Sequence, residues 1–407
     1  MVICQYVIIC IITALSLMSL FYLKKQKKDK TINIFLLVLA SVLTVLFVIR
    51  YMSGDDSISS IFALNSDIFN NKFLNFVSLI FNWIFMTNIL LVILNQFFGT
   101  KEVENIIRII TFPISILTIA AIVPMSIGIV GRTQYYSFNF RTIIMAIELS
   151  LVLVYSYWKF WENNKFRIEK SEIKDLFFVI ILFLSVIPSY ALKALFGYSN
   201  ISTIKDFTFV HRLILYLSIL IPILLYLLLI KKSEKFKKFV ILFICVATMN
   251  TFTFNHKFST FTSVTSWPFH LCNTAMYLIT ICLIFKWDRL FYFTYFINVL
   301  GAFLAMAMPN YSVDADLFSS GILNFYINHY IAFFMPILIV ALGIYKRPNK
   351  KTFYYASMGF IAYFVFILII NAWFSNYAKV DYFFVNSDFI ADKLGTWAKN
   401  LRNVTLQ

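Results

Sequence analysis

Apolar residues fill long, uninterrupted stretches of this chain, and short polar or charged stretches separate them. Most of the apolar stretches approach about 20 residues, the length that a helix needs to cross the hydrocarbon layer of a membrane. A transmembrane barrel would instead show short segments of alternating polarity. The pattern predicts an all-α, polytopic transmembrane helical bundle of about twelve spans, at residues 2–23, 31–51, 75–98, 105–129, 138–158, 174–196, 208–230, 238–254, 264–285, 289–308, 321–345 and 352–374.

Composition supports the same fold class. Apolar residues make up 61% of the chain and charged residues only 13%, about half the share of a soluble domain. The net charge is +16, yet the basic residues lie in short loops and are not pooled on one soluble face. This charge therefore indicates membrane topology rather than nucleic-acid binding. We expect membrane lipids as partners and no nucleic acid.

The basic residues alternate between successive loops. The loops that follow the odd-numbered helices, with Arg108 and Lys174, hold 23 of the 35 Lys and Arg residues. Loops after the even-numbered helices, such as MSGDDSISS at 52–60, are poor in basic residues. Because cytoplasmic loops carry the excess of Lys and Arg, the odd loops are predicted to be cytoplasmic. We predict a multi-pass protein of the cell membrane with both termini extracytoplasmic, including the tail from Ser375.

Parts of the chain resemble each other. Two N-terminal stretches parallel two later ones, 20–45 with 227–249 and 70–88 with 255–273. Since each unit would hold an even number of helices, the pattern predicts two parallel six-helix repeats, residues 1–200 and 201–407. The polar residues do not repeat, so we interpret the first half as a degenerate, structural copy. The second half carries the candidate chemistry and the external tail.

Polar residues of three predicted helices lie at one depth. The helix at 264–285 is predicted to enter from outside, with Pro268 in its first turn and two reactive side chains, His270 and Cys272, just below. Because unpaired polar groups are costly in lipid, these side chains should turn inward and line one pocket in the outer leaflet. The other two helices contribute Tyr326, Asn328 and His329, and Asn371, Asn376 and Tyr377.

Cys272 is the candidate nucleophile of this pocket. A thiol needs a nearby imidazole to become a thiolate, and His270, two residues away, cannot face it on one helix. His329 from another helix is the better base. The amide and phenol groups are candidates for binding substrate or an oxyanion: Asn273, Thr274, Tyr326, Asn328, Asn371, Asn376 and Tyr377.

Plainer interpretations of the same residues stay open. A buried His or Cys is often only a packing residue. His270, Cys272 and His329 suit zinc by type, but three ligands without a carboxylate make a poor site, so we expect no metal and no cofactor. His211 and His256 are predicted to be solvated or structural. Glu148 is predicted to form a structural ion pair, with Arg141 as one candidate partner.

Several motifs of the second half carry a family resemblance. They are Pro268-Phe269-His270-Leu271-Cys272, FYFTYFINVLGAFLAMAMPN at 291–310, Asn328-His329, and the run from Asn371 to Tyr377. Over roughly 205–380 they resemble the bacterial YwaF-like integral membrane proteins in order and spacing. Phe269 replaces the usual Leu, Ser375 stands where Thr is typical, and the first half is an addition.

The YwaF-like proteins are distantly similar to a eukaryotic transmembrane acyltransferase that remodels ether phospholipids through a cysteine thioester. They are also similar to membrane hydrolases that pair a threonine with a histidine on fatty-acid esters. The resemblance implies that Cys272 accepts an acyl group, His329 acts as base and His270 assists, with Thr274 as the alternative nucleophile. We therefore expect a lipid-directed acyltransferase or hydrolase. A twelve-helix transporter of solutes or lipids and a non-catalytic membrane scaffold are the alternatives.

Overall fold

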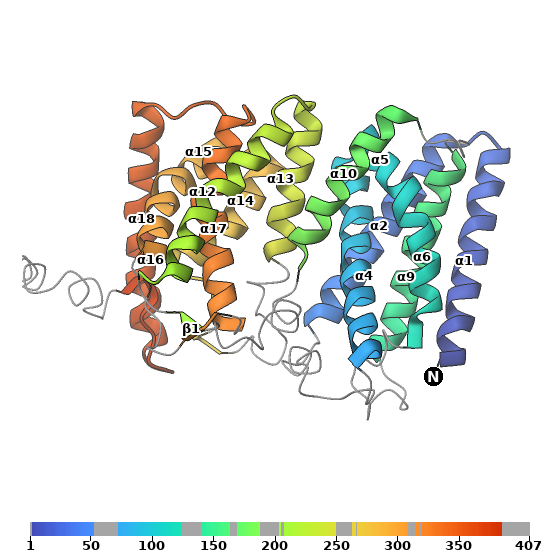
Figure 1. Ribbon diagram of the computed structural model, residues 1–407, viewed down its shortest axis with the longest axis horizontal. Helices are drawn as coiled ribbons and strands as arrows, with labels where there is room; N and C mark the ends of the chain where they lie inside the picture. Colours follow the sequence, from blue (N-terminus) through green and yellow to red (C-terminus); the bar gives the residue numbers. More distant parts are fainter. Residues whose placement is uncertain are drawn as a thin grey trace, which may run out of the picture. The chain divides into compact units, whose positions relative to one another are not determined.

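The computed structural model describes most of the chain. The described residues are 2–52, 72–123, 140–162, 169–187, 203–204, 207–249, 263–265, 267–307, 309, 315–317 and 320–384. His256, the tail beyond 384 and the predicted helix ends at 124–129, 188–196 and 250–254 lie outside them. Contacts group the described helices into two units, and long helices run side by side within each (Figure 1).

The described part of unit 1 contains nine helical segments, with α9 at its centre. α9 packs against α1, α2, α4, η1 and α6, and most of its inward side chains are buried. The segments of this unit are α1 (Val2–Lys25), α2 (Asp29–Met52), α4 (Lys72–Phe98), α5 (Lys101–Ile106), η1 (Ile107–Thr111), α6 (Phe112–Ala120), α9 (Phe140–Glu162), α10 (Lys170–Ser185) and α13 (Glu234–Thr248).

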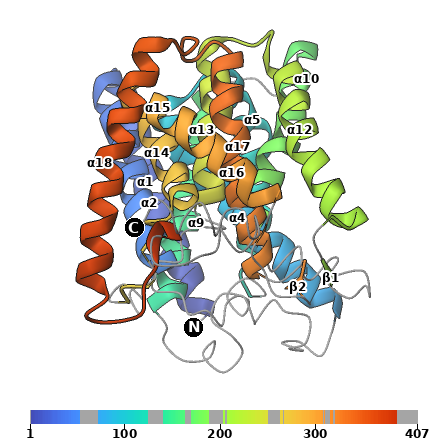
Figure 2. The same ribbon diagram turned by 90° about the vertical axis from the view of Figure 1, so that its left-hand side faces the viewer.

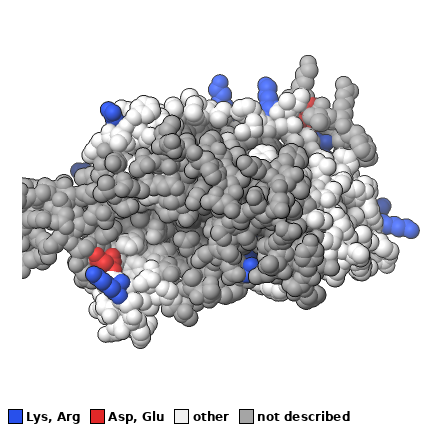
Figure 3. Space-filling model, turned by 60° about the horizontal axis from the view of Figure 1, so that its bottom comes forward, with Lys and Arg blue, Asp and Glu red and all other residues white. Residues whose placement is uncertain are grey.

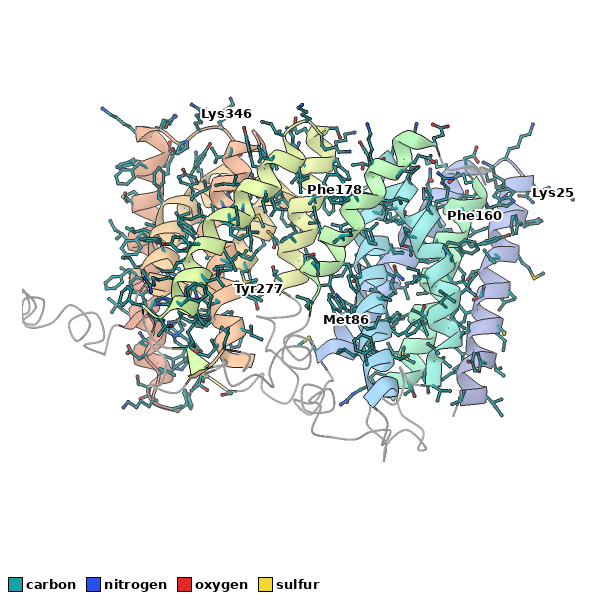
Figure 4. The ribbon with its side chains drawn as sticks, viewed as in Figure 1. Lys25, Met86, Phe160, Phe178, Tyr277 and Lys346 are labelled. Carbon is teal, nitrogen blue, oxygen red and sulfur yellow. The ribbon has the colours of Figure 1, made fainter. Side chains whose placement is uncertain are left out.

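α13 packs with α10 and α4 in unit 1, although it follows α12 in the sequence. Its side chains from Phe239 to Cys245 are all buried. Phe236 meets Phe178 of α10 edge to face, with ring centroids 4.9 Å apart (Figure 4). α13 lies in the second predicted half, residues 201–407, but it packs in unit 1, so the packing units differ from the predicted halves at this helix. A helix buried along most of its surface must have neighbours on several sides, and α10 and α4 are two of them. The internal repeat itself stays a prediction.

Unit 2 contains the remaining helices and one minimal sheet. In the sheet, Thr203 and Ile204 pair antiparallel with Asp316 and Ala315. α18 packs along α15 in this unit (Figure 2). The segments are β1 (Thr203–Ile204), α12 (Phe209–Leu229), α14 (Leu271–Phe285), α15 (Asp288–Phe293), η3 (Thr294–Asn298), α16 (Val299–Ala307), β2 (Ala315–Asp316), α17 (Ser320–Ala341), α18 (Lys350–Phe374) and η4 (Tyr382–Phe384).

Polar side chains fix several helix starts beside the basic loops. Thr100 caps α5 by accepting from the Val103 N–H at 3.4 Å, and Ser233 caps α13 by accepting from the Phe236 N–H at 3.3 Å. Asn349 caps α18 in a capping box with Thr352. Each side chain satisfies a backbone donor that the first helical turn leaves unpaired. In the view of Figure 3, the described Lys and Arg side chains stand apart from one another.

The predicted fold class is confirmed. By length and composition, eight helices within the described residues are suited to crossing a membrane, and α14 and residues 325–341 are shorter apolar helices. Two predicted spans are interrupted by a π-helical turn: η1 lies between α5 and α6, and η3 lies between α15 and α16. Each of the twelve predicted spans thus has a helix in the described structure.

One predicted helix start is wrong. The helix expected from residue 264 begins at Leu271, with His270 as its N-cap in an extended conformation. Pro268 therefore precedes the helix and does not lie in its first turn. The reason is local, since proline pushes the residue before it, Trp267, away from helical geometry.

A buried ion pair links two helices of unit 1. Arg50 Nε lies 2.6 Å from Glu148 Oε2, and the Glu148 side chain is fully buried. The Arg50 guanidinium also lies over the Phe47 and Phe85 rings. Glu148 thus forms an ion pair, as the sequence predicts, but its partner is Arg50 of α2 and not the expected Arg141.

We expect Glu148→Leu to lower the stability of the protein by about 3–5 kcal/mol, because it leaves a buried cation without its carboxylate. The double variant Arg50→Met with Glu148→Leu should recover most of this loss, since an apolar pair of similar size needs no charge compensation. Thermal denaturation in detergent, followed by helix content, measures both.

Asp29→Asn is the control for this experiment, because Asp29 pairs with Lys24 at an exposed site. Exposed pairs contribute little, so this variant should denature like wild type. A double variant no more stable than Glu148→Leu alone would contradict the structural role of the pair.

Candidate functional site

The first turn of α14 carries four of the candidate residues: His270, Cys272, Asn273 and Thr274. The His270 carbonyl accepts from the N–H groups of Asn273 and Thr274, both at 3.0 Å. This turn is therefore closed by backbone bonds, and its side chains project from a fixed frame. The His270 ring lies 5.4 Å from the Tyr382 ring, which brings the start of α14 beside the segment that follows α18.

A pair of amides joins α14 to α17 beside Cys272. The Asn328 side chain donates from Nδ2 to Asn273 Oδ1. The Cys272 thiol also points at Asn273 Oδ1, with the sulfur 3.9 Å from the oxygen. Asn328 is buried, and its Oδ1 has no hydrogen-bond partner. The structure therefore brings Cys272, Asn273 and Asn328 together, with His329 next in sequence.

The His329 ring is held in one tautomer. Its Nδ1 lies 2.6 Å from the Phe325 carbonyl oxygen. Because a carbonyl can only accept, Nδ1 carries the proton, and Nε2 of the neutral ring holds the lone pair. The ring is buried and packs on the Phe325 ring at a centroid distance of 4.2 Å. His329 is thus prepared as a proton acceptor at Nε2.

Tyr363 of α18 is a contact that the sequence pattern did not reveal. Its hydroxyl donates to the Phe269 carbonyl oxygen at 2.6 Å, which ties α18 to the segment just before α14. A phenol in the middle of an apolar helix needs a polar partner. The position of Tyr363 within an apolar run could therefore have identified it as a contact residue from the sequence. Thr274 itself donates to the Leu271 carbonyl oxygen at 2.8 Å.

Tyr382 holds the segment that leads into α14. Its hydroxyl donates to the Val264 carbonyl oxygen and accepts from the Trp267 N–H at 3.2 Å. Burial raises the pKa of the Tyr382 phenol, so the phenol keeps the proton that it donates. Its ring lies 5.4 Å from both the Phe269 and the His270 rings. Tyr382 thereby positions the chain that carries His270.

Asn371 of α18 fastens Tyr382 in turn. Its Nδ2 donates to the Tyr382 carbonyl oxygen at 2.8 Å, and its Oδ1 accepts from the Tyr382 N–H at 2.9 Å. Both polar groups of this buried side chain are therefore occupied by one backbone unit. The geometry assigns Asn371 a structural contact, and its predicted contact with substrate stays a prediction.

Three other predicted residues lie elsewhere in unit 2. Tyr326 is buried in a cluster with Ile204, Ile214 and Met306. Asn376 is exposed and donates to the Trp373 carbonyl oxygen at 3.0 Å, and Tyr377 is 70% exposed. Near Tyr326, His211 is structural, because its ring nitrogens contact the Phe207 N–H and the Met306 carbonyl oxygen, both at 2.8 Å.

Within the described residues, no three His, Cys, Asp or Glu side chains come together as a metal site. The site is instead built of amides, phenols, two imidazoles and a thiol on α14, α17 and the end of α18. All of these elements belong to unit 2.

The comparison with known families locates the same region. Residues 206–399 match the model of the TMEM164 family. This TMEM164-like region includes every predicted site residue, and with the apolar helices it indicates a multi-pass membrane protein. No curated protein and no solved structure matches the chain.

Tyr382→Phe should increase hydrogen exchange at the Trp267 amide, because this N–H loses its acceptor. One hydrogen bond contributes about 0.5–1.5 kcal/mol, which corresponds to a rate increase of about 2- to 12-fold. Hydrogen–deuterium exchange with mass spectrometry of the peptide spanning 263–270 measures it. Tyr377→Phe makes the same change at an exposed phenol and should leave this peptide unaffected. Equal exchange in both variants would refute the positioning role.

Proposed function

We propose that this protein is a lipid-directed acyltransferase or hydrolase that uses Cys272 as nucleophile and His329 as base. The observation that carries the proposal is the amide pair Asn273–Asn328, which holds the first turn of α14 against α17 beside His329. The family resemblance described above points to the same two residues.

The reaction begins with a proton transfer. The Cys272 thiol turns from Asn273 Oδ1 toward His329, and Nε2 takes its proton. The thiolate attacks the carbonyl carbon of a lipid ester, the carbon–oxygen ester bond breaks, and the imidazolium returns its proton to the alcohol that leaves. A thioester on Cys272 remains, and a hydroxyl compound then takes the acyl group.

The neighbouring polar groups have separate roles in this proposal. Asn328 and Asn273 offer amide groups beside the sulfur, where charge develops on the ester oxygen. His270 assists the base, as the family resemblance implies. Thr274 is the alternative nucleophile, and its hydroxyl donates to the Leu271 carbonyl oxygen at 2.8 Å.

Acylation can be observed directly. The purified protein, incubated with a long-chain p-nitrophenyl ester, should gain one acyl mass on Cys272 that hydroxylamine removes. Cys272→Ser and His329→Ala should each lower the rate of adduct formation by at least about 100-fold, since a base contributes about 10²–10⁴-fold. Intact-mass and peptide mass spectrometry give both results.

Cys282→Ser is the matched control, because Cys282 is a buried thiol on the same helix. An adduct on Thr274 that survives Cys272→Ser would transfer the nucleophilic role to Thr274. Wild-type protein without any adduct would refute the enzymatic proposal.

Transport is the second candidate function, because twelve predicted spans in two parallel six-helix halves are a known transporter architecture. Counterflow into proteoliposomes distinguishes the two functions. Solute exchange that Cys272→Ala leaves unchanged would support transport. A scaffold function would tolerate replacement of His270, Cys272 and His329 together.

We further propose that the protein lies in the cell membrane with both termini outside, which the basic loops after odd-numbered helices support. Alkaline phosphatase folds only outside the cytoplasm, so a fusion to residue 407 should be active. A fusion in the loop at Lys346 should be inactive. The reverse result would invert the topology and move the candidate site to the cytoplasmic leaflet.

A further inference from the structure

Asn298 is the most unusual polar side chain in unit 2. It is only 1% exposed, and among the residues that the structure describes neither its Nδ2 nor its Oδ1 has a hydrogen-bond partner. The carboxamide offers two donors and one acceptor, so an apolar setting penalises it at both ends. A side chain that costs stability and contributes no contact to the fold requires another explanation.

The backbone around Asn298 is also irregular. Asn298 ends the π-helical turn η3 (Thr294–Asn298) between α15 and α16. A π turn inserts an extra residue into a helix and changes the direction of the side chains that follow, and such turns occur often at functional sites. Thr294, at the start of the same turn, is satisfied locally, because its hydroxyl donates to the Phe291 carbonyl oxygen at 2.7 Å.

Asn298 lies at the depth of the candidate site. η3 packs against both α14 and α18, and only Lys286 and Trp287 connect α14 to α15. From Asp288 to Asn298 the helix rises about 15 Å, and the same rise back along α14 from Phe285 reaches Ala275. Ala275 adjoins Thr274, so the unpaired carboxamide stands about one turn below Cys272, in the interior of the bundle.

We propose that Asn298 is a substrate-binding residue of the acyl-transfer site, and this inference rests on the proposed function. Its Nδ2 donates to the carbonyl oxygen of the bound acyl group. Its Oδ1 accepts from a second O–H of the hydroxyl compound that removes the acyl group from Cys272, either the other proton of water or a neighbouring hydroxyl of a polyol, while the reacting O–H faces His329. A ligand with an ester carbonyl beside a free hydroxyl pairs both ends of the carboxamide at once.

This role places Asn298 chiefly in the second step. The hydroxyl oxygen forms a bond to the acyl carbon while the carbon–sulfur bond of the thioester breaks. His329 Nε2 takes the hydroxyl proton and gives it to the departing sulfur, which restores the Cys272 thiol. Holding the hydroxyl compound against the thioester removes its freedom to diffuse before this step.

Asn298→Leu tests the proposal by separating function from stability. Leu has a similar size and no polar atoms, so the variant should melt at or above the wild-type temperature. Single-turnover decay of the Cys272 thioester should slow by about 10- to 100-fold. Thr294→Val alters the same π turn without touching the carboxamide and should keep the wild-type decay rate.

A binding measurement decides the proposal independently of the chemistry. 1-Octanoylglycerol carries an ester carbonyl and neighbouring hydroxyls, and it should raise the melting temperature of wild type and Thr294→Val. It should not raise that of Asn298→Leu, nor of Asn298→Ala, which serves if the Leu variant does not fold. An equal shift in wild type and Asn298 variants, or no shift in wild type, overturns the inference.

The two proposals fail in different ways. If Cys272 is acylated and Asn298→Leu loses its thioester at the wild-type rate, the role of Asn298 is wrong while the proposed function stands. If Cys272 is never acylated, the enzymatic function is wrong, and the melting experiment alone decides whether Asn298 binds a hydroxy ester. A large loss of melting temperature in both Asn298 variants would assign the carboxamide a structural role.

Discussion

A membrane helix has no water with which to hydrogen-bond, so every polar group inside the bundle must find a partner within the protein or a ligand. Unit 1 meets this constraint in part. Glu148 meets Arg50, Glu172 meets Arg108 at 2.7 Å, and the Asn95 amide donates to the Tyr155 hydroxyl at 2.9 Å. Other buried polar atoms of this unit, such as Asn95 Oδ1 and Trp158 Nε1, have no hydrogen-bond partner among the described residues. Unit 2 applies the same rule to its own frame. There the Asn371 carboxamide hydrogen-bonds the Tyr382 backbone at both its oxygen and its nitrogen. The Tyr382 hydroxyl in turn holds the segment that leads to His270.

The helices were predictable from hydropathy because the length and polarity of a span follow from the thickness of the membrane alone. Hydropathy does not report where a span stops being helical. The predicted helix continues through residues 264–270, yet the helix begins only at Leu271, with His270 as an extended N-cap and with Val264 and Trp267 hydrogen-bonded to Tyr382. The π turns at η1 and η3 were equally invisible, since one inserted residue leaves the mean polarity of a span unchanged. Mean hydropathy also does not indicate which helices pack against each other, as the neighbours of α13 show.

For the candidate site, residue type and depth identified His270, Cys272, Asn273, Asn328 and His329, because few reactive side chains lie in these spans. They did not identify which polar groups are already occupied. Asn371 and Asn328 look equivalent in the sequence, yet both polar atoms of the Asn371 side chain have a partner, whereas Asn328 Oδ1 has none among the described residues. The proton position on His329 likewise depends on a carbonyl four residues earlier, at Phe325. Which amides are already hydrogen-bonded, and which nitrogen of His329 carries the proton, can be read only from distances in the structure.

The distinction between occupied and unoccupied amides is what separates frame from site in unit 2. A side chain kept for the fold should have its hydrogen bonds made before any ligand arrives, as Asn371 and Tyr382 do. A side chain kept for a ligand should be buried, correctly placed and incomplete, which describes Asn328 Oδ1 and both ends of Asn298. The second class lowers stability in the absence of ligand, and selection retains such residues where function requires them. The Asn328 amide is joined to Asn273 beside Cys272, and Asn298 stands about one helical turn deeper. If the proposals above hold, the polar atoms left unpaired by the fold are those that await the polar groups of a ligand.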